Sequence, residues 1–225
     1  MLNNQILRTG FPVLHLYDKI SLALSLMEDF EIQHLPVTDN EIYVGMVRKA
    51  DLLDTYEDLT IAALQDLLIK VFAKSDDYFL TALQLLKEHH LSLIPVLSEK
   101  GELLGIINQE DLLSAIYNFM GGDEPGGLIV LEIDKRHFSF GEICRLIETN
   151  DAMIMQLNTT FLKDTGKVLA TIKINKTEIS DIVATFQRYD YEVKYYFGEE
   201  QYNNELKDNY HHLMNYLNID RKSVV

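Results

Sequence analysis

Residues 1–120 contain the same sequence pattern twice. "VGMVRKADLL" begins at residue 44, and "LGIINQEDLL" begins at residue 104. Gly45 recurs as Gly105, and Asp51 recurs as Asp111, both at an offset of 60 residues. A repeat of this length is one supersecondary unit, which cannot bury both of its faces alone. The chain is therefore expected to pack two similar units against each other.

Each copy has the same predicted order of elements. Apolar residues at helical spacing precede a short β-type run, which is "HLPVTD" in the first copy and "LIPVLS" in the second. A turn and a second β-type run follow, "IYVGMV" or "LLGIIN", and the Asp-Leu-Leu segment then begins a helix. We predict two βαββα repeats, at residues 1–60 and 61–120, packed as a pseudo-twofold pair.

A Gly- and Pro-rich linker at residues 121–127, "GGDEPGG", separates the repeats from a different pattern. Residues 128–200 alternate predicted strands and helices in the order βαββαβ, which is the ferredoxin-like motif. Its helices are predicted at residues 138–150 and 176–190. Apolar residues recur at helical spacing in the tail, residues 201–225, and predict an amphipathic helix there: Leu206, Tyr210, Leu213 and Leu217. The fold class is α+β.

The charge balance argues against a nucleic-acid-binding protein. The chain has 20 basic and 35 acidic residues and a net charge of −15, whereas affinity for a phosphate backbone depends on Lys and Arg. No apolar run reaches the roughly 18 residues of a membrane helix. The start, "MLNNQILRTGFP", lacks the features of a secretory signal. Together with the single Cys144, these features predict a cytoplasmic protein that binds neither nucleic acid nor membrane.

No catalytic motif is present in the sequence. It contains no Gly-rich phosphate loop, no Gly-x-Ser-x-Gly and no His-Glu-x-x-His. The adjacent His211 and His212 would point to different faces of the predicted tail helix, which argues against a shared metal site. We therefore predict no enzyme activity, no catalytic residues, no metal site and no resident cofactor.

The repeats resemble the tandem CBS-domain pair, also called a Bateman module. The resemblance rests on Leu-Pro-Val at 35–37, on Ile-Pro-Val at 94–96 and on the Gly-apolar-apolar-x-x-x-Asp strings that end at Asp51 and Asp111. It implies two clefts between the sheets, which in that family commonly bind AMP, ATP or S-adenosylmethionine. It also implies a homodimer that regulates a partner. Because the chain carries no fused enzyme or transporter domain, that partner protein would be regulated in trans.

The resemblance implies a ribose-binding carboxylate where each second strand leads into a helix. Asp51 and Asp111 would each accept charge-assisted hydrogen bonds from the two ribose hydroxyls. The family usually has Thr or Ser three residues earlier, where this chain has Arg48 and Asn108. Arg48 cannot cap a helix but could pair with a phosphate, assisted by Lys49, whereas Asn108 is a good helix cap and a polar ligand contact.

Alternatives remain open for several of these residues. His34 occupies a place where some family members carry a basic phosphate contact, and it is otherwise a surface or cleft-edge residue. The pattern from Asn108 to Asp111 also matches a capping box, which explains Asp111 without a ligand. If only one cleft holds a phosphorylated ligand, we expect it to be the cleft lined by Arg48.

The C-terminal pattern resembles an ACT domain. That family usually has a Gly between the first strand and the first helix, where this chain has "DKRHFSFGEI", with Phe138 near that place and Gly141 beyond it. Because only Gly lets a backbone approach a ligand so closely, we expect dimerisation or signal relay from this unit rather than amino-acid binding. The whole layout is similar to the acetoin utilisation protein B group, which is treated mostly as a group of regulators.

Two functions from different classes follow. The first is a regulatory protein that senses an adenine nucleotide (AMP, ADP or ATP) or S-adenosylmethionine in its CBS clefts and relays the signal in trans. The second is a ligand-free dimeric scaffold that acts through protein contacts. The loss of Thr or Ser at Arg48 and Asn108 favours the second function.

Overall fold

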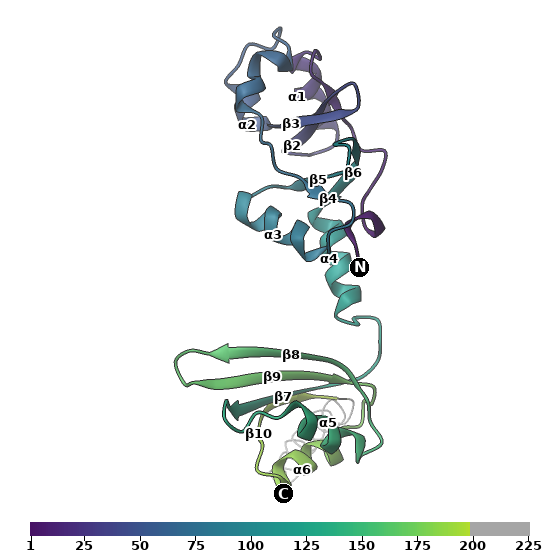
Figure 1. Ribbon diagram of the computed structural model, residues 1–225, viewed down its shortest axis with the longest axis vertical. Coiled ribbons are helices and arrows are strands. Elements are labelled where there is room, and N and C mark those ends of the chain that lie inside the picture. The colour runs from purple at the N-terminus through teal and green to yellow at the C-terminus, as the bar shows by residue number, and fades with distance from the viewer. Residues whose placement is uncertain (199–225) are drawn as a thin grey trace, which may run out of the picture. The chain divides into compact units, whose positions relative to one another are not determined.

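Two three-stranded sheets, ordered β1-β2-β3 and β4-β5-β6, build the N-terminal unit in the computed structural model, which describes residues 1–198 (Figure 1). The first repeat consists of β1 (Leu14–His15), α1 (Ile20–Asp29), β2 (His34–Asp39), β3 (Ile42–Arg48) and α2 (Lys49–Leu53). The second consists of β4 (Ala73–Lys74), α3 (Leu80–His89), β5 (Leu93–Leu97), β6 (Leu103–Asn108) and α4 (Gln109–Phe119). The predicted βαββα order is confirmed in both copies.

The first hairpin turns where the sequence predicts it. Asn40 and Glu41 connect β2 to β3, and their φ angles are 49° and 70°. Positive φ at both central residues is the mark of the tight turns that match the twist of a β-hairpin. In each sheet the middle strand, β2 or β5, pairs in parallel with the strand before it and antiparallel with the strand after it.

The segment that precedes each repeat pairs with a strand of the other repeat. Arg8 and Ile106 of β6 exchange backbone hydrogen bonds of 2.7 and 3.1 Å. Ile69 and Met46 of β3 exchange two bonds of 2.9 Å. Met46 and Ile106 are 60 residues apart and equivalent in the repeat. The two repeats are thus tied together reciprocally, as expected for a packed pair.

Close backbone approach explains the recurring glycine. A Cβ atom on Gly105 would lie 2.6 Å from the carbonyl oxygen of Arg8. A Cβ atom on Gly45 would lie 2.6 Å from the Cβ of Leu68. In both repeats, therefore, the crossing segment leaves no room for a side chain at this glycine, which lies in the second strand of the hairpin. Two 3₁₀ segments belong to these crossings, η1 (Asn3–Gln5) and η2 (Ile61–Leu67).

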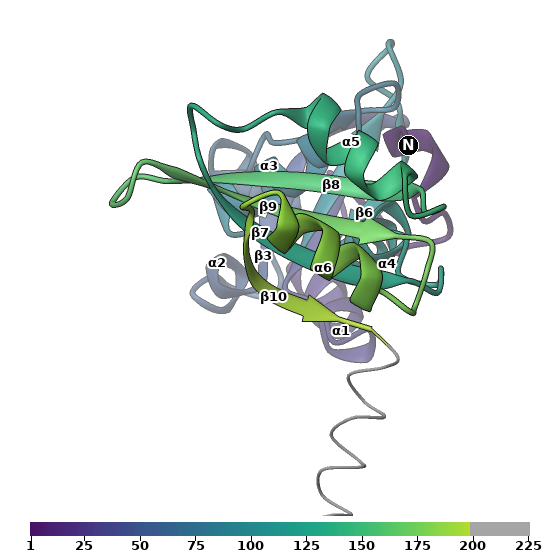
Figure 2. The ribbon, with the colours of Figure 1, turned by 90° about the horizontal axis from the view of Figure 1, so that it is seen from below.

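The C-terminal unit, which begins at Asn118, is a four-stranded antiparallel sheet. Its strand order is β10-β7-β9-β8, and α5 and α6 cover one face of the sheet (Figures 1 and 2). The elements are β7 (Gly127–Asp134), α5 (Phe140–Glu148), β8 (Ile154–Leu162), β9 (Lys167–Ile174), α6 (Ser180–Arg188) and β10 (Glu192–Phe197). Apolar side chains of the covered face and of both helices form one buried core, so the predicted βαββαβ order is observed.

Both helices of this unit begin later than predicted. Ser139 accepts a hydrogen bond from the backbone N–H of Glu142 at 3.3 Å and so caps α5, which begins at the next residue. The residues before α6 form a loop instead, because the carbonyl of Lys176 accepts a 2.6 Å bond from the N–H of Gly127. Among residues 1–198 no helix is long and apolar enough to cross a membrane. The predicted tail helix, with His211 and His212, lies outside the described residues.

Candidate functional site at two strand-to-helix corners

Asn108 and Asp111 cap the helix that follows β6. The backbone N–H of Asp111 donates to Asn108 Oδ1 at 2.8 Å, and the N–H of Asn108 donates to Asp111 Oδ2 at 3.3 Å. This reciprocal pair is a capping box, which satisfies two of the free N–H groups at a helix start. We call residues 108–111 the second corner. The alternative interpretation of Asp111 as part of a helix cap is confirmed.

Arg8 holds the other oxygen of the same carboxylate. Its Nη2 lies 2.8 Å from Asp111 Oδ1 and 3.4 Å from Glu110 Oε2. The Asp111 side chain is only 15% exposed, so this ion pair is partly shielded from water. The sequence interpretation missed Arg8. Aligning the segments that precede the two repeats would have pointed to it, because Leu7-Arg8 before the first repeat corresponds to Leu68-Ile69 before the second.

The first corner, residues 48–51, has the same backbone plan with different side chains. Arg48 is the N-cap residue of α2 and makes no side-chain bond to it, as predicted. Among residues 1–198, the Asp51 carboxylate has no hydrogen-bond or ion-pair partner, since Ile69 stands where the second corner has Arg8. The backbone N–H of Lys49 donates to the carbonyl of Gln33 at 2.9 Å.

Arg48 and Asp51 together line a shallow hollow that has no room for a water molecule. Its other lining residues are apolar and come from the end of β3 and from the crossing segment: Val47, Leu64, Leu67 and Leu68. Typical small-molecule pockets measure roughly 300–1,000 Å³, so the hollow as it stands cannot hold a ligand. A nucleotide at this corner would therefore require η2 to shift.

His34 is buried, so the expected surface position is wrong. Only 4% of the residue is exposed, because it begins the central strand β2, opposite Arg48 of β3, and contacts the second repeat. Its Nδ1 lies 2.8 Å from Ser92 Oγ and accepts the backbone N–H of Ser92 at 3.4 Å. The ring proton is then on Nε2, which has no partner among the described residues. Burial lowers the pKa of His34, Arg48 lowers it further, and Asp51 opposes the shift.

His34 and Ser92 also line a pocket of about 730 Å³. Most of its remaining wall is apolar and comes from α3 and α4 of the second repeat, including Leu83, Leu86, Leu112, Leu113 and Ile116. The pocket lies beside these helices and reaches the second corner at Gln109. His34 therefore joins the two repeats, because it contacts Ser92 of the second repeat and pairs with Arg48 of the first corner. Its phosphate contact stays a prediction.

The family model for the CBS domain matches residues 4–58 and again residues 65–118. Residues 4–118 are a tandem pair of CBS domains. The two matches coincide with the two three-stranded sheets described above. The CBS pair thus contains both corners.

Proteins similar to the CBS pair are known from sequence and structure. An inosine-5′-monophosphate dehydrogenase from Methanocaldococcus jannaschii is 32% identical over 117 residues, which are 50% of this chain and 23% of that enzyme. A CBS domain pair/ACT domain protein from Thermotoga maritima is 24% identical, with a TM-score of 0.49, over 53% of this chain and 99% of that one. CBSX2, solved in complex with AMP, is 22% identical, with a TM-score of 0.46, over 53% of this chain and 98% of that one.

The structure brings the predicted site residues together in two groups. Arg48 and Asp51 share the first corner, next to Lys49. Asn108 and Asp111 share the second corner, with Arg8 added. Within residues 1–198 no group of three His, Cys, Asp or Glu side chains could hold a metal ion. The ribose and phosphate roles of these residues stay predictions.

Proposed function

We propose that the CBS pair is a regulatory sensor that binds an adenine nucleotide or S-adenosylmethionine, with Asp51 as the ribose ligand. The observation that carries this proposal is the unpartnered carboxylate of Asp51, at the strand-to-helix corner of a matched CBS domain. A carboxylate can accept hydrogen bonds from two neighbouring hydroxyls at once. The cationic side chains of Arg48 and Lys49 flank it and suit a phosphate.

Ligand entry would couple the first corner to the rest of the CBS pair. The hollow at Asp51 is closed by leucines of η2 and of the segment after it. The same segment continues into Ile69, which is hydrogen-bonded to β3, and then into the second repeat. A nucleotide that pushed η2 outward would therefore shift the connection between the repeats. This is a route by which binding could change the relation of one repeat to the other.

The alternative candidate is a ligand-free dimeric scaffold. Asp111 is fully accounted for by its own chain, through Asn108 and Arg8. Large apolar side chains are also exposed on helices of the CBS pair, with Leu53 65% and Leu113 69% exposed. A second copy of the chain would cover such residues. Sedimentation of the full chain tests the proposed homodimer, and a monomer at micromolar concentration would contradict it.

We also propose that the C-terminal unit is ACT-like and acts in dimerisation or relay. The strand order β10-β7-β9-β8 and the two helices on one face support this assignment. Gly141 lies inside α5, and Phe138, in the β7–α5 loop, packs against the core. The loop therefore lacks the glycine that would let its backbone approach an amino-acid ligand closely. The output is proposed to reach a partner protein in trans. A pull-down with the full chain from its native source tests for that partner.

Calorimetry of the full chain with AMP, ADP, ATP and S-adenosylmethionine tests the proposed function. We expect at least one of the four to bind with a Kd below millimolar. The AMP complex of CBSX2 is a property of that protein and here only places AMP in the panel. If a folded sample bound none of the four, the sensor function would be refuted and the scaffold would be favoured.

A further inference from the structure

We propose that Arg8 determines which corner accepts the ribose, because it holds Asp111 in an ion pair that Asp51 lacks. This inference rests on the proposed function, since it assigns the regulation of the same binding site. It makes the two corners unequal even though their backbones follow one plan. The first corner would bind the ligand, and the second would be held closed by its own chain.

The two corners differ at one equivalent position in the crossing segments. Arg8 is hydrogen-bonded through its backbone to Ile106, and Ile69 is bonded in the same way to Met46. The segments cross Gly105 and Gly45 at the same close distance. The Arg8 side chain reaches Asp111 at the second corner, whereas Ile69, at the equivalent backbone position, packs against the apolar core of the second repeat and offers Asp51 no donor. A guanidinium can reach a carboxylate there, whereas an isoleucine cannot.

The contacts of Asp111 explain why this difference matters for a ribose. Its Oδ1 pairs with Arg8 at 2.8 Å, and its Oδ2 accepts the N–H of Asn108 at 3.3 Å. Two ribose hydroxyls would have to share these oxygens with, or displace, a charge-assisted bond. The same hydroxyls would meet no such competitor at Asp51. Because hydrogen bonds to charged groups are the strong ones, we expect the second corner to bind roughly tenfold more weakly or worse.

The shielding of Asp111 strengthens the competition by Arg8, whose own side chain is 47% exposed. Exposed ion pairs contribute little, since water competes for both partners. The carboxylate of Asp111 is mostly shielded, and Glu110 offers the guanidinium a second acceptor at 3.4 Å. Backbone hydrogen bonds to Ile106 of β6 also fix the place from which the Arg8 side chain extends. These features distinguish the pair from an incidental surface contact.

Calorimetry on the full chain tests the inference, with AMP, ADP, ATP and S-adenosylmethionine as probes in turn. Asp51→Ala removes the first corner, so that any remaining binding reports the second corner. Arg8→Ile reproduces the residue at the equivalent position of the first corner, and Arg8→Gln is a milder second variant. Ile69→Arg makes the converse change. Arg188→Gln, in the C-terminal unit, is the control for loss of one positive charge.

We expect wild type to bind one equivalent of ligand, and Asp51→Ala to bind at least about tenfold more weakly. Adding Arg8→Ile or Arg8→Gln to Asp51→Ala should restore at least about tenfold in affinity, and Arg188→Gln should not. Ile69→Arg should weaken ligand binding at the first corner, provided that circular dichroism shows the variant to be folded. Two equal sites in wild type, or no gain from either Arg8 variant, would overturn the inference but leave the proposed function standing. Absence of all binding would overturn both.

Discussion

Asn108 Oδ1 accepts the backbone N–H of Asp111 at 2.8 Å, and no equivalent bond exists at Arg48, 60 residues earlier. The start of α4 is thus capped by a side chain, whereas the start of α2 is not. This asymmetry has a direct consequence for stability, because a missing cap leaves helix N–H groups without a partner. It also suits α2 to a corner that can change when a ligand arrives.

Removing the cap at α4 should destabilise the CBS pair, and adding one at α2 should stabilise it. We expect Asn108→Ala to lower the free energy of unfolding by about 1 kcal/mol, a typical value for a lost N-cap. Arg48 has φ −105° and ψ 138°, an extended conformation that an N-cap residue adopts. Arg48→Asn should therefore raise the free energy of unfolding, by less than this amount. Urea denaturation measures both, and a stabilised Asn108→Ala would contradict the capping geometry.

The stability of the CBS pair should fall between pH 7 and pH 5 because of His34. Burial and Arg48 lower the pKa of its ring, so the unfolded chain binds this proton more readily than the folded one. Stability then rises with pH up to the unfolded pKa, about 6.5, and falls below it. His34→Leu introduces the residue that the second repeat has at the equivalent position, Leu93. The variant should show a smaller slope of stability against pH. Thermal melts across this pH range measure the slope, and equal slopes in both proteins would refute the assignment.

Gly105→Ala should destabilise the CBS pair through backbone contact. The new Cβ would lie 2.6 Å from the carbonyl oxygen of Arg8, so the crossing segment would have to move. Such overpacking typically costs about 1–3 kcal/mol. Gly141→Ala is the matched control, because nothing lies within 4 Å of its added Cβ and the residue is helical. Denaturant midpoints should fall for Gly105→Ala only; equal effects at the two glycines would count against the close crossing.

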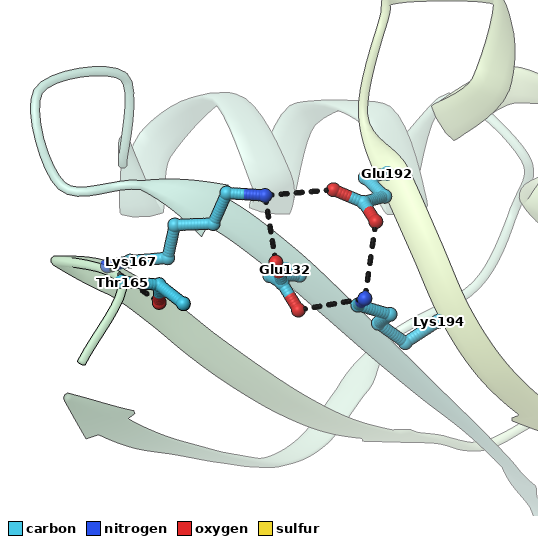
Figure 3. Close-up of polar contacts among 5 residues, drawn as sticks. All are labelled: Glu132, Thr165, Lys167, Glu192 and Lys194. Carbon is cyan, nitrogen blue, oxygen red and sulfur yellow. Dashed lines mark hydrogen bonds and ion pairs between the residues drawn. The ribbon is translucent and has the colours of Figure 1, made fainter. Parts of the chain in front are cut away.

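Four alternating charges connect β7, β9 and β10 on the sheet of the C-terminal unit (Figure 3). Lys167 Nζ lies 2.6 Å from Glu132 and 3.0 Å from Glu192, and Lys194 Nζ lies 2.9 and 3.2 Å from the same carboxylates. Both lysines lower the pKa of Glu132. Networks of this kind can stabilise a sheet where isolated surface pairs do not.

Glu132→Gln should lower the Tm of the C-terminal unit at pH 7. The contribution of this carboxylate is present above its ordinary pKa, 4.5, and is lost as pH falls through its lowered folded pKa. The difference in Tm between wild type and variant should therefore shrink in acid and in high salt. Glu124→Gln, an exposed residue with the same charge change, is the control. A difference that persisted unchanged in acid would rule out the ionic network as its cause.

The sequence predicted the repeat architecture well because both copies could be compared with each other. Gly45 and Gly105, the Pro-containing strands and the Asn40-Glu41 turn all mark local backbone requirements that a sequence shows directly. The ends of α5 and α6 were harder, since a cap at Ser139 and a backbone bond to Lys176 determine them. The similarity to the acetoin utilisation protein B group and the cytoplasmic location stay predictions.

The site was only half visible in the sequence. Asp51, Asp111, Arg48 and Asn108 were found because they recur at one offset. The contact from Arg8 spans more than 100 positions in the chain and depends on which segment crosses which strand. The burial of His34 likewise depends on Ser92 of the other repeat. Such relationships come from packing between the repeats and have no local signature.

The affinity of the full chain for AMP compared with 2′-deoxy-AMP tests the central claim most directly. If Asp51 binds both ribose hydroxyls, loss of one charge-assisted bond should weaken binding by roughly tenfold or more. Asp51→Asn should remove most of this preference, whereas Asp111→Asn should leave it intact. Equal affinities for AMP and 2′-deoxy-AMP in wild type would contradict the assignment of Asp51 as the ribose ligand.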